Sequence, residues 1–190
     1  MSYDDDPEGW SARLRAKLEP DAIRSTLAFA GLYQLVHEMI KSSVLDDLKG
    51  CYGQSSLEKG QWLWGDESYR AEVLALAPKN EFRASLLWLE EAGAMTSEQI
   101  ERLDEIYGHR HELAHELVRF IIDADRDVDV LLLMDALAIL RDIARFWTQM
   151  EIDMGSFDSH VAVTVDEVQP GRLLVLDTCL DAYLGQWPHS

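Results

Sequence analysis

Apolar residues at helical spacing constrain the fold of this chain more than any other feature of its sequence. Between residues 20 and 49, aliphatic side chains recur at every fourth position: Leu32, Val36, Ile40, Val44 and Leu48. Residues 128–152 carry a second stripe of this kind: Val130, Leu133, Leu137, Leu140, Ala144 and Trp147. Because successive residues lie about 100° apart around a helix axis, each stripe forms one apolar face. Two long helices with one buried face each predict a helical bundle.

Residues that favour helix ends set the expected boundaries in the first half of the chain. Proline is favoured in the first turn of a helix, and glycine often follows the last turn, so Pro20 and Gly53 delimit the first long helix. Residues 51–66 are rich in glycine and tryptophan and predict a connecting loop. Two shorter helices are expected after it, at about 67–77 and 80–92.

The second half of the chain is also expected to be helical. Thr96 and Gln99 have the spacing of a capping box, which predicts the start of a helix. Gly108 predicts an interruption, so we expect a separate helix at about 109–123. An aspartate-rich, solvated turn then caps the helix at 128–152.

The sequence therefore predicts an all-α fold with one domain. Residues 1–19 are expected to form an acidic N-terminal arm and a short lead-in, and residues 20–190 the helical domain. Alternating valines predict a short strand or an irregular segment near 160–166. A terminal helix is expected from Leu173 to Leu184.

Several features favour a cytoplasmic protein. No apolar run reaches the roughly 18 residues that a membrane-spanning helix needs, so no membrane association is expected. The first residues are acidic and lack the basic and apolar regions of a signal peptide. The two cysteines, Cys51 and Cys179, have no CxxC spacing and are expected to be free, buried thiols.

The chain is strongly acidic. It contains 35 Asp and Glu against 17 Lys and Arg, for a formal net charge of −18. Such a charge repels nucleic acid at long range, which disfavours binding through a general basic surface. Any chemistry on RNA would require a local cationic pocket, a second subunit or a basic partner.

The segment Tyr-Gly-His-Arg-His-Glu-Leu-Ala-His-Glu-Leu at 107–117 concentrates the residues suited to catalysis. His111 to His115 matches the H-E-x-x-H pattern of zinc metalloproteases. Both histidines would lie on one helix face and share a metal, with Glu112 as the base. A zinc site also needs a third protein ligand, and Asp135 is an irregular candidate for it. A zinc hydrolase therefore remains one alternative.

Arg110 and His115 carry a second pattern. The run Arg110-His111-Glu112-Leu113-Ala114-His115 resembles the R-x4-H signature of metal-independent ribonucleases of the HEPN superfamily. His111 occupies the position that is commonly polar in that family. HEPN domains are small all-α bundles. The resemblance covers the motif specifically, and residues 20–155 only in the order and length of the helices.

The resemblance implies an endoribonuclease that needs no cofactor. RNA cleavage without a metal needs a base, an acid and a cation for the phosphate, and imidazole and guanidinium supply these groups. The catalytic residues would be Arg110, His115 and His111. His109 and Arg119 would add positive charge for the substrate. HEPN bundles often place a polar residue of an early helix near the motif, and the candidate for this substrate-binding position is Glu38.

Arg110 and His115 would lie about 140° apart on a straight helix. They converge only if Arg110 lies at a frayed helix start near Gly108, or if a second subunit completes the site. The resemblance to HEPN ribonucleases implies that a second subunit completes the site, because in that family the motifs of two subunits pair across a symmetric dimer. We therefore expect a homodimer that forms through the region from Arg110 to His115.

Each candidate residue also has a purely structural interpretation. His115 would then be a half-buried histidine, and Arg110 a partner of Asp104 or Glu105. His109 would be exposed to solvent, and Glu38 would form a plain surface pair with the preceding histidine. These interpretations remain open at the level of the sequence.

Three functions are compatible with these patterns. The first is a HEPN-type endoribonuclease acting on RNA, as a toxin or antiphage defence effector in a prokaryotic cytoplasm, with an antitoxin or another protein as partner. The second is a non-catalytic acidic helical partner of the same fold, such as an antitoxin, immunity protein or regulatory subunit, which the net charge of −18 favours. The third is the H-E-x-x-H zinc hydrolase.

Overall fold

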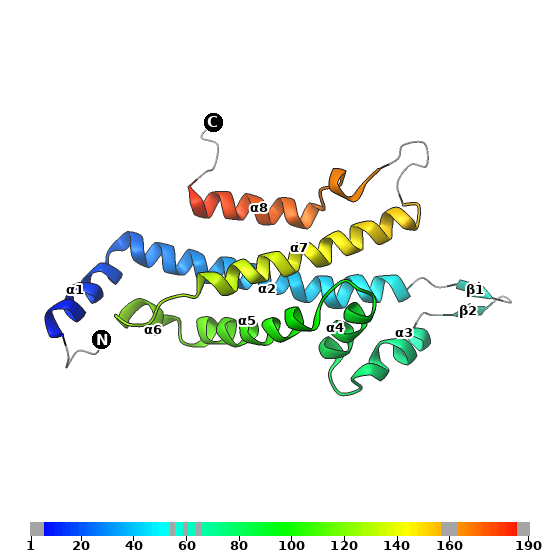
Figure 1. Ribbon diagram of the computed structural model, residues 1–190, viewed down its shortest axis with the longest axis horizontal. Coiled ribbons are helices and arrows are strands. Elements are labelled where there is room, and N and C mark those ends of the chain that lie inside the picture. Colours follow the sequence, from blue (N-terminus) through cyan, green and yellow to red (C-terminus); the bar gives the residue numbers. More distant parts are fainter. Residues whose placement is uncertain (1–5, 54–55, 59–60, 64–65, 157–162, 186–190) are drawn as a thin grey trace.

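The computed structural model describes residues 6–53, 56–58, 61–63, 66–156 and 163–185. Helices make up most of this part of the chain (Figure 1): α1 (Pro7–Lys17), α2 (Pro20–Tyr52), α3 (Asp66–Glu72), α4 (Glu81–Glu91), α5 (Ser97–His115), α6 (Leu117–Ile122), α7 (Val130–Asp153) and α8 (Gly171–Leu184). Two 3₁₀ turns are formed by Leu74–Leu76 and Val165–Glu167. The predicted all-α single-domain bundle is confirmed.

The two long helices form the centre of the bundle. In Figure 1, α2 and α7 run side by side, with α8 along one side of them and α5 and α4 along the other. The predicted apolar stripes are buried between these helices except for Val130, which lies at the start of α7 and is 53% exposed, and Val36, Val44 and Leu140 have no exposed surface. The indole Nε1 of Trp147 donates a hydrogen bond to the carbonyl of Ser43 at 3.0 Å, which also joins α7 to α2.

The predicted helix caps are present. The Thr96 hydroxyl accepts a hydrogen bond from the amide of Gln99 at 3.2 Å, and the Gln99 side chain accepts one from the amide of Thr96 at 2.9 Å. This capping box fixes the start of α5. At the start of α7, a carboxylate oxygen of Asp129 accepts a hydrogen bond from the amide of Leu132 at 3.0 Å. Both caps satisfy amides that the first helical turn leaves without partners.

Gly108 does not interrupt its helix, so the prediction of a separate helix at 109–123 was wrong. Helix α5 continues through Gly108 to His115, and the chain breaks at Glu116 before α6. Ile106 and Leu113, on either side of the glycine, are both buried. Burial of these two side chains outweighs the roughly 1 kcal/mol penalty of a helical glycine.

The segment at 51–66 also differs from expectation, and the segment near 160–166 is described only in part. Within the predicted loop at 51–66, the chain forms an antiparallel hairpin of β1 (Ser56–Glu58) and β2 (Gln61–Leu63), with Leu57 opposite Trp62. Near 160–166, the described residues include a 3₁₀ turn that begins at Val165, whereas residues 160–162 lie outside the described part.

The predicted arm at 1–19 contains a helix, α1, from Pro7 onwards. Asp6 caps it, because its carboxylate accepts a hydrogen bond from the amide of Gly9 at 3.0 Å. Residues 1–5 lie outside the described part. Both cysteines are free, but Cys51 is exposed and Cys179 only half-buried, so the expected burial of Cys51 was wrong.

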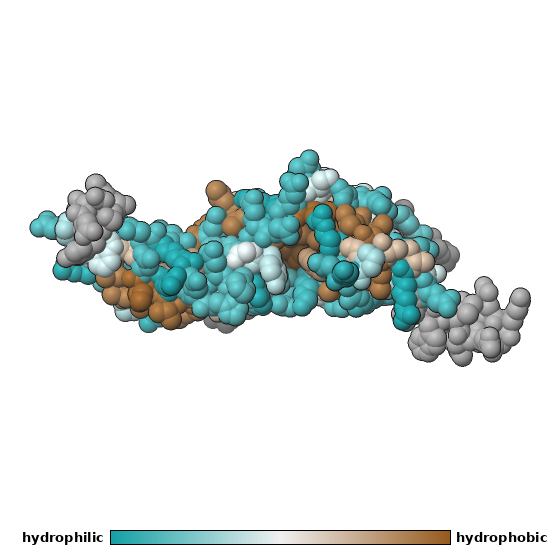
Figure 2. Space-filling view, turned by 90° about the horizontal axis from the view of Figure 1, so that it is seen from below, coloured by the Kyte–Doolittle hydropathy of each residue, from teal (hydrophilic) through white to brown (hydrophobic). Residues whose placement is uncertain are grey.

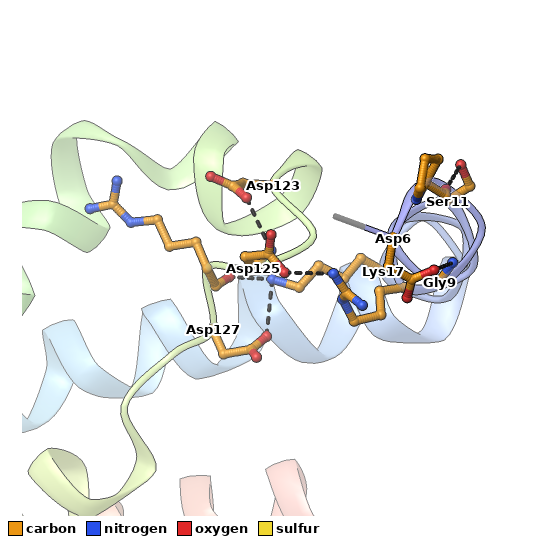
Figure 3. Close-up of polar contacts among 10 residues, drawn as sticks. Asp6, Gly9, Ser11, Lys17, Asp123, Asp125 and Asp127 are labelled. Atoms are coloured by element: carbon orange, nitrogen blue, oxygen red, sulfur yellow. Dashed lines mark hydrogen bonds and ion pairs between the residues drawn. The ribbon is translucent and has the colours of Figure 1, made fainter. Parts of the chain in front are cut away.

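Ion pairs attach α1 to the aspartate-rich turn between α6 and α7 (Figure 3). Arg13 pairs with Asp125 at 2.9 Å, and the Lys17 ammonium pairs with Asp127 at 3.0 Å. Lys17 also donates hydrogen bonds to the backbone carbonyls of Phe120 and Arg126. The turn, expected to be solvated, thus holds α1 as well as capping α7.

Among the described residues, no helix combines the length and the apolar character needed to span a membrane.

Candidate functional site

The motif at 107–117 lies mainly on the last turns of α5, which pack against α2. Buried Ile106 and Leu113 face the core, and the Tyr33 hydroxyl of α2 donates a hydrogen bond to the Ile106 carbonyl at 3.3 Å. Burial raises the pKa of this phenol far above its usual range, so it remains protonated and a donor. The motif therefore sits on a rigid part of the bundle.

Arg110 is held by two polar residues of α2. Its Nε donates a hydrogen bond to the amide oxygen of Gln34 at 2.8 Å, and its Nη2 lies 3.6 Å from a carboxylate oxygen of Glu38. Gln34 in turn donates to Glu38 at 2.9 Å. The structure thus brings Arg110 together with Glu38, the early-helix residue singled out from the sequence. Arg110 does not pair with Asp104 or Glu105, as its structural interpretation supposed, because its guanidinium contacts α2.

His37 borders this network. Its ring lies 5.5 Å from the ring of Tyr107, and its Nδ1 lies 3.4 Å from a carboxylate oxygen of Glu38 without hydrogen-bond geometry. Burial, followed by the charge of Arg110, lowers the pKa of His37. Its imidazole is therefore neutral at neutral pH.

His111 and His115 form an exposed pair on α5. Four residues apart, they share one helix face, and their ring centroids are 4.3 Å apart. The alternative interpretation of His115 as a half-buried histidine does not hold, because the last turn of α5 extends beyond the packed Leu113. Arg110 is directed to α2 and is therefore not brought to His115 within one chain.

His109 has a structural place between helices. Its ring packs edge-on against Tyr33 at 5.3 Å and Phe120 at 5.7 Å, and its Nε2 accepts a hydrogen bond from the amide of Asp129 at 3.1 Å. Burial lowers the pKa of this imidazole, against the opposing charge of Asp129. The expected solvent exposure was therefore wrong, since the side chain joins α5 to the start of α7.

The other arginines near the motif also form ion pairs with carboxylates. Arg119 is exposed and pairs with Glu116 at 3.1 Å. Arg126, which the sequence reasoning missed, pairs with Glu116 at 2.6 Å and with Glu112 at 3.0 Å. Its guanidinium also lies 4.6 Å from the centre of the Phe120 ring. The hydrogen bond from Arg126 lowers the pKa of Glu116, so this carboxylate stays ionised.

Arg126 stabilises the break between α5 and α6, because it pairs with Glu116 at the break and with Glu112 in the last turn of α5. No local sequence pattern marks this role. A single arginine in an aspartate-rich turn would be expected to pair with its neighbours in sequence. The contact arises only because α6 returns the chain beside the end of α5.

The residues expected for zinc binding are engaged elsewhere. Glu112 pairs with Arg126, and Asp135 accepts a hydrogen bond from Arg102 Nε at 2.7 Å. Within the described ranges, no three side chains of His, Cys, Asp or Glu are grouped closely enough to hold a metal ion. The exposed histidine pair would need a third ligand from another source.

Comparison of the chain with protein-family models, with curated proteins and with solved structures finds no match.

Proposed function

We propose that the protein is a metal-independent endoribonuclease of HEPN type that acts as a homodimer. The observation that carries this proposal is the exposed pair of imidazoles, His111 and His115, with ring centroids 4.3 Å apart. Acid–base cleavage of RNA needs one group to take the proton of the 2′-hydroxyl and another to give a proton to the leaving oxygen. Neighbouring imidazoles suit both roles, since histidine is the side chain that most often transfers protons in catalysis.

Arg110 would provide the cation for the phosphate. Its side chain keeps 23% of its surface exposed, and its attachment to Gln34 and Glu38 limits the conformations of the guanidinium. A fixed guanidinium stabilises developing phosphate charge without the cost of reorganisation. Because Arg110 and His115 diverge on one helix, the complete site requires a second copy of the motif.

The surface near the motif is suited to a dimer contact. Tyr107 on α5 and Val118 and Ile122 on α6 are 55%, 65% and 53% exposed. Figure 2 shows hydrophobic surface at the end of the molecule that carries α1 and α6. Exposed apolar groups in one region often mark a protein interface. The contact would bring two imidazole pairs and two guanidinium groups to one place.

The net charge of −18 supports a second candidate, a non-catalytic acidic partner of another protein. Arg110, Arg119 and Arg126 each contact at least one carboxylate. The region around the motif thus has little uncompensated positive charge for RNA. An antitoxin or immunity subunit with carboxylates on its surface fits this feature better than an enzyme does.

Metal dependence tests the proposal directly. We expect purified protein to cleave RNA equally well before and after treatment with EDTA, because the proposed acid, base and cation are side chains. Cleavage would be followed on a labelled RNA, and bound zinc would be measured on the same sample. Activity that chelation removes and one equivalent of zinc restores would contradict this mechanism and favour the zinc hydrolase. Complete lack of cleavage would favour the acidic partner.

The oligomeric state is a second expected result. Light scattering should give a dimer, and Val118→Asp should convert it to a monomer that has lost cleavage, since a buried charge at the contact is unfavourable. Met154→Asp is the matched control, because Met154 is similarly exposed, at 63%, at the far end of α7. A monomeric wild-type protein that cleaves RNA would overturn the composite site.

A further inference from the structure

A cavity of about 470 Å³ lies between the end of α2, the second half of α7 and the segment that enters α8. Its lining on α2 begins at Asp46, whereas the α2 contacts of the motif end at Glu38. At about 1.5 Å per residue, the two regions are separated by roughly 12 Å along the helix. The cavity is therefore a separate site, and a ligand bound in it would be independent of the proposed ribonuclease activity.

The floor of the cavity is apolar. Trp147 and Thr148 are buried there, and their polar atoms are already used inside the fold. Trp147 Nε1 donates to the Ser43 carbonyl at 3.0 Å, and the Thr148 hydroxyl donates to the Ala144 carbonyl at 2.9 Å. The thioether of Met150 also lines the cavity. A ligand would meet hydrocarbon, aromatic and thioether surface at this depth.

The rim of the cavity is acidic. Its charged residues are the carboxylates Asp46, Asp47 and Glu151 and the guanidinium of Arg172, so three negative charges and one positive charge leave a net −2. The guanidinium of Arg172 forms a bidentate ion pair with the carboxylate of Asp47. Nη1 of Arg172 lies 2.7 Å from Oδ2 of Asp47, and Nη2 lies 2.8 Å from Oδ1. The Glu151 carboxylate has no hydrogen-bond or ion-pair partner within the described part of the chain. Its charge is therefore available to a ligand.

Cys51 adds no charge to the cavity at neutral pH. Although Cys51 as a residue is exposed, partial burial of its thiol raises the thiol pKa, and the carboxylates of Asp47 and Glu151 raise it further. The thiol lies 3.7 Å from the Met150 sulfur, so it belongs to the soft, uncharged part of the lining. The negative charge of the site thus comes from the rim carboxylates alone.

We propose that this cavity binds a small organic cation, an aliphatic ammonium. The ammonium group would lie at the rim near Glu151 and Asp46, and the hydrocarbon chain would lie on Trp147 and Met150. Pockets for small molecules have this arrangement, in which an apolar interior is combined with a few charged groups that fix the ligand's orientation. A neutral ligand would gain only apolar contacts with the floor of the cavity. An anion would be repelled by the carboxylates of the rim.

Gly50 offers a way to close the cavity. It lines the site on the last turns of α2, and a Cβ added at this position meets no atom within 4 Å apart from its chain neighbours and the backbone of its own helix. Leucine at this position would project into open space and should not weaken the helix, because leucine has a higher helix propensity than glycine. Gly31 is the matched control, since it is also helical, has the same open surroundings and does not line the cavity.

Calorimetry at low ionic strength would compare n-pentylammonium, 1-pentanol and pentanoate. We expect n-pentylammonium to bind, 1-pentanol to bind at least tenfold more weakly and pentanoate not to bind. Gly50→Leu should abolish the binding of n-pentylammonium, Gly31→Leu should leave it unchanged, and Glu151→Gln should weaken it by about threefold, as for one exposed charge. Equal binding of the amine and the alcohol, or unchanged binding to Gly50→Leu, would overturn the proposal.

The two free thiols provide a second readout that does not require a variant. Cys51 lines the cavity, whereas Cys179 lies on α8 outside its lining. Saturation with n-pentylammonium should slow alkylation of Cys51 several-fold and leave the rate at Cys179 unchanged, as followed by mass spectrometry. Equal rates with and without the amine at Cys51 would place any binding elsewhere and refute the assignment.

Discussion

His115→Ala should lower the rate of RNA cleavage by at least about a hundredfold, because general acid–base catalysis contributes that much or more. Arg110→Ala should cause a loss of similar size, since the guanidinium would stabilise the charge that develops on the phosphate. His115 is exposed, so its replacement should leave the thermal unfolding temperature unchanged. Cleavage of a labelled RNA, measured beside thermal unfolding, separates the loss of chemistry from the loss of fold.

Glu112→Gln is the matched control for this experiment. Glu112 lies on the same helix and would be the base of a zinc hydrolase, but the proposed ribonuclease does not use it. We expect this variant to retain most of its cleavage. If His115→Ala and Arg110→Ala both cleave RNA at the wild-type rate, the ribonuclease proposal fails. A loss at Glu112 as large as that at His115 would instead favour metal-assisted hydrolysis.

Leu140→Ala should lower the free energy of unfolding by about 2–5 kcal/mol, because it removes a fully buried side chain and leaves a cavity between the central helices. The control on the same helix is Leu131→Ala. Leu131 is 67% exposed, and its truncation should change the free energy of unfolding by less than about 0.5 kcal/mol. Urea denaturation of dilute protein measures both. Equal effects of the two substitutions would contradict the assignment of α7 as a central helix.

The long helices could be predicted because one periodic signal repeats along each of them. The stripes of α2 and α7 and the capping box of Thr96 and Gln99 depend on residues close in sequence, and all of them are found except for the exposed Val130 at the start of α7. Gly108 misled the prediction because local propensity is a weak term beside the burial of Ile106 and Leu113. The hairpin within residues 51–66 escaped prediction because its strands are only three residues long.

The surroundings of the motif were less predictable than its position. The sequence placed Arg110, His111 and His115 on one helix, and the spacing of the two histidines implied their contact. Which cation meets which carboxylate depends on how helices pack. The contacts of Arg110 with Glu38 and of Arg126 with Glu112 join residues far apart along the chain, and no local pattern encodes them.

The attachment of α1 gives the molecule two layers that respond to different conditions. Helix α1 contributes no buried side chain, and Arg13 and Lys17 join it to the aspartate-rich turn. The pair of Arg13 with Asp125, whose side chains are 39% and 40% exposed, weakens as salt screens it, whereas apolar burial does not. Ionic strength can therefore alter how firmly α1 covers its end of the bundle while α2 and α7 stay folded. Heat and denaturant would unfold the core of α2 and α7, whereas salt would weaken the attachment of α1.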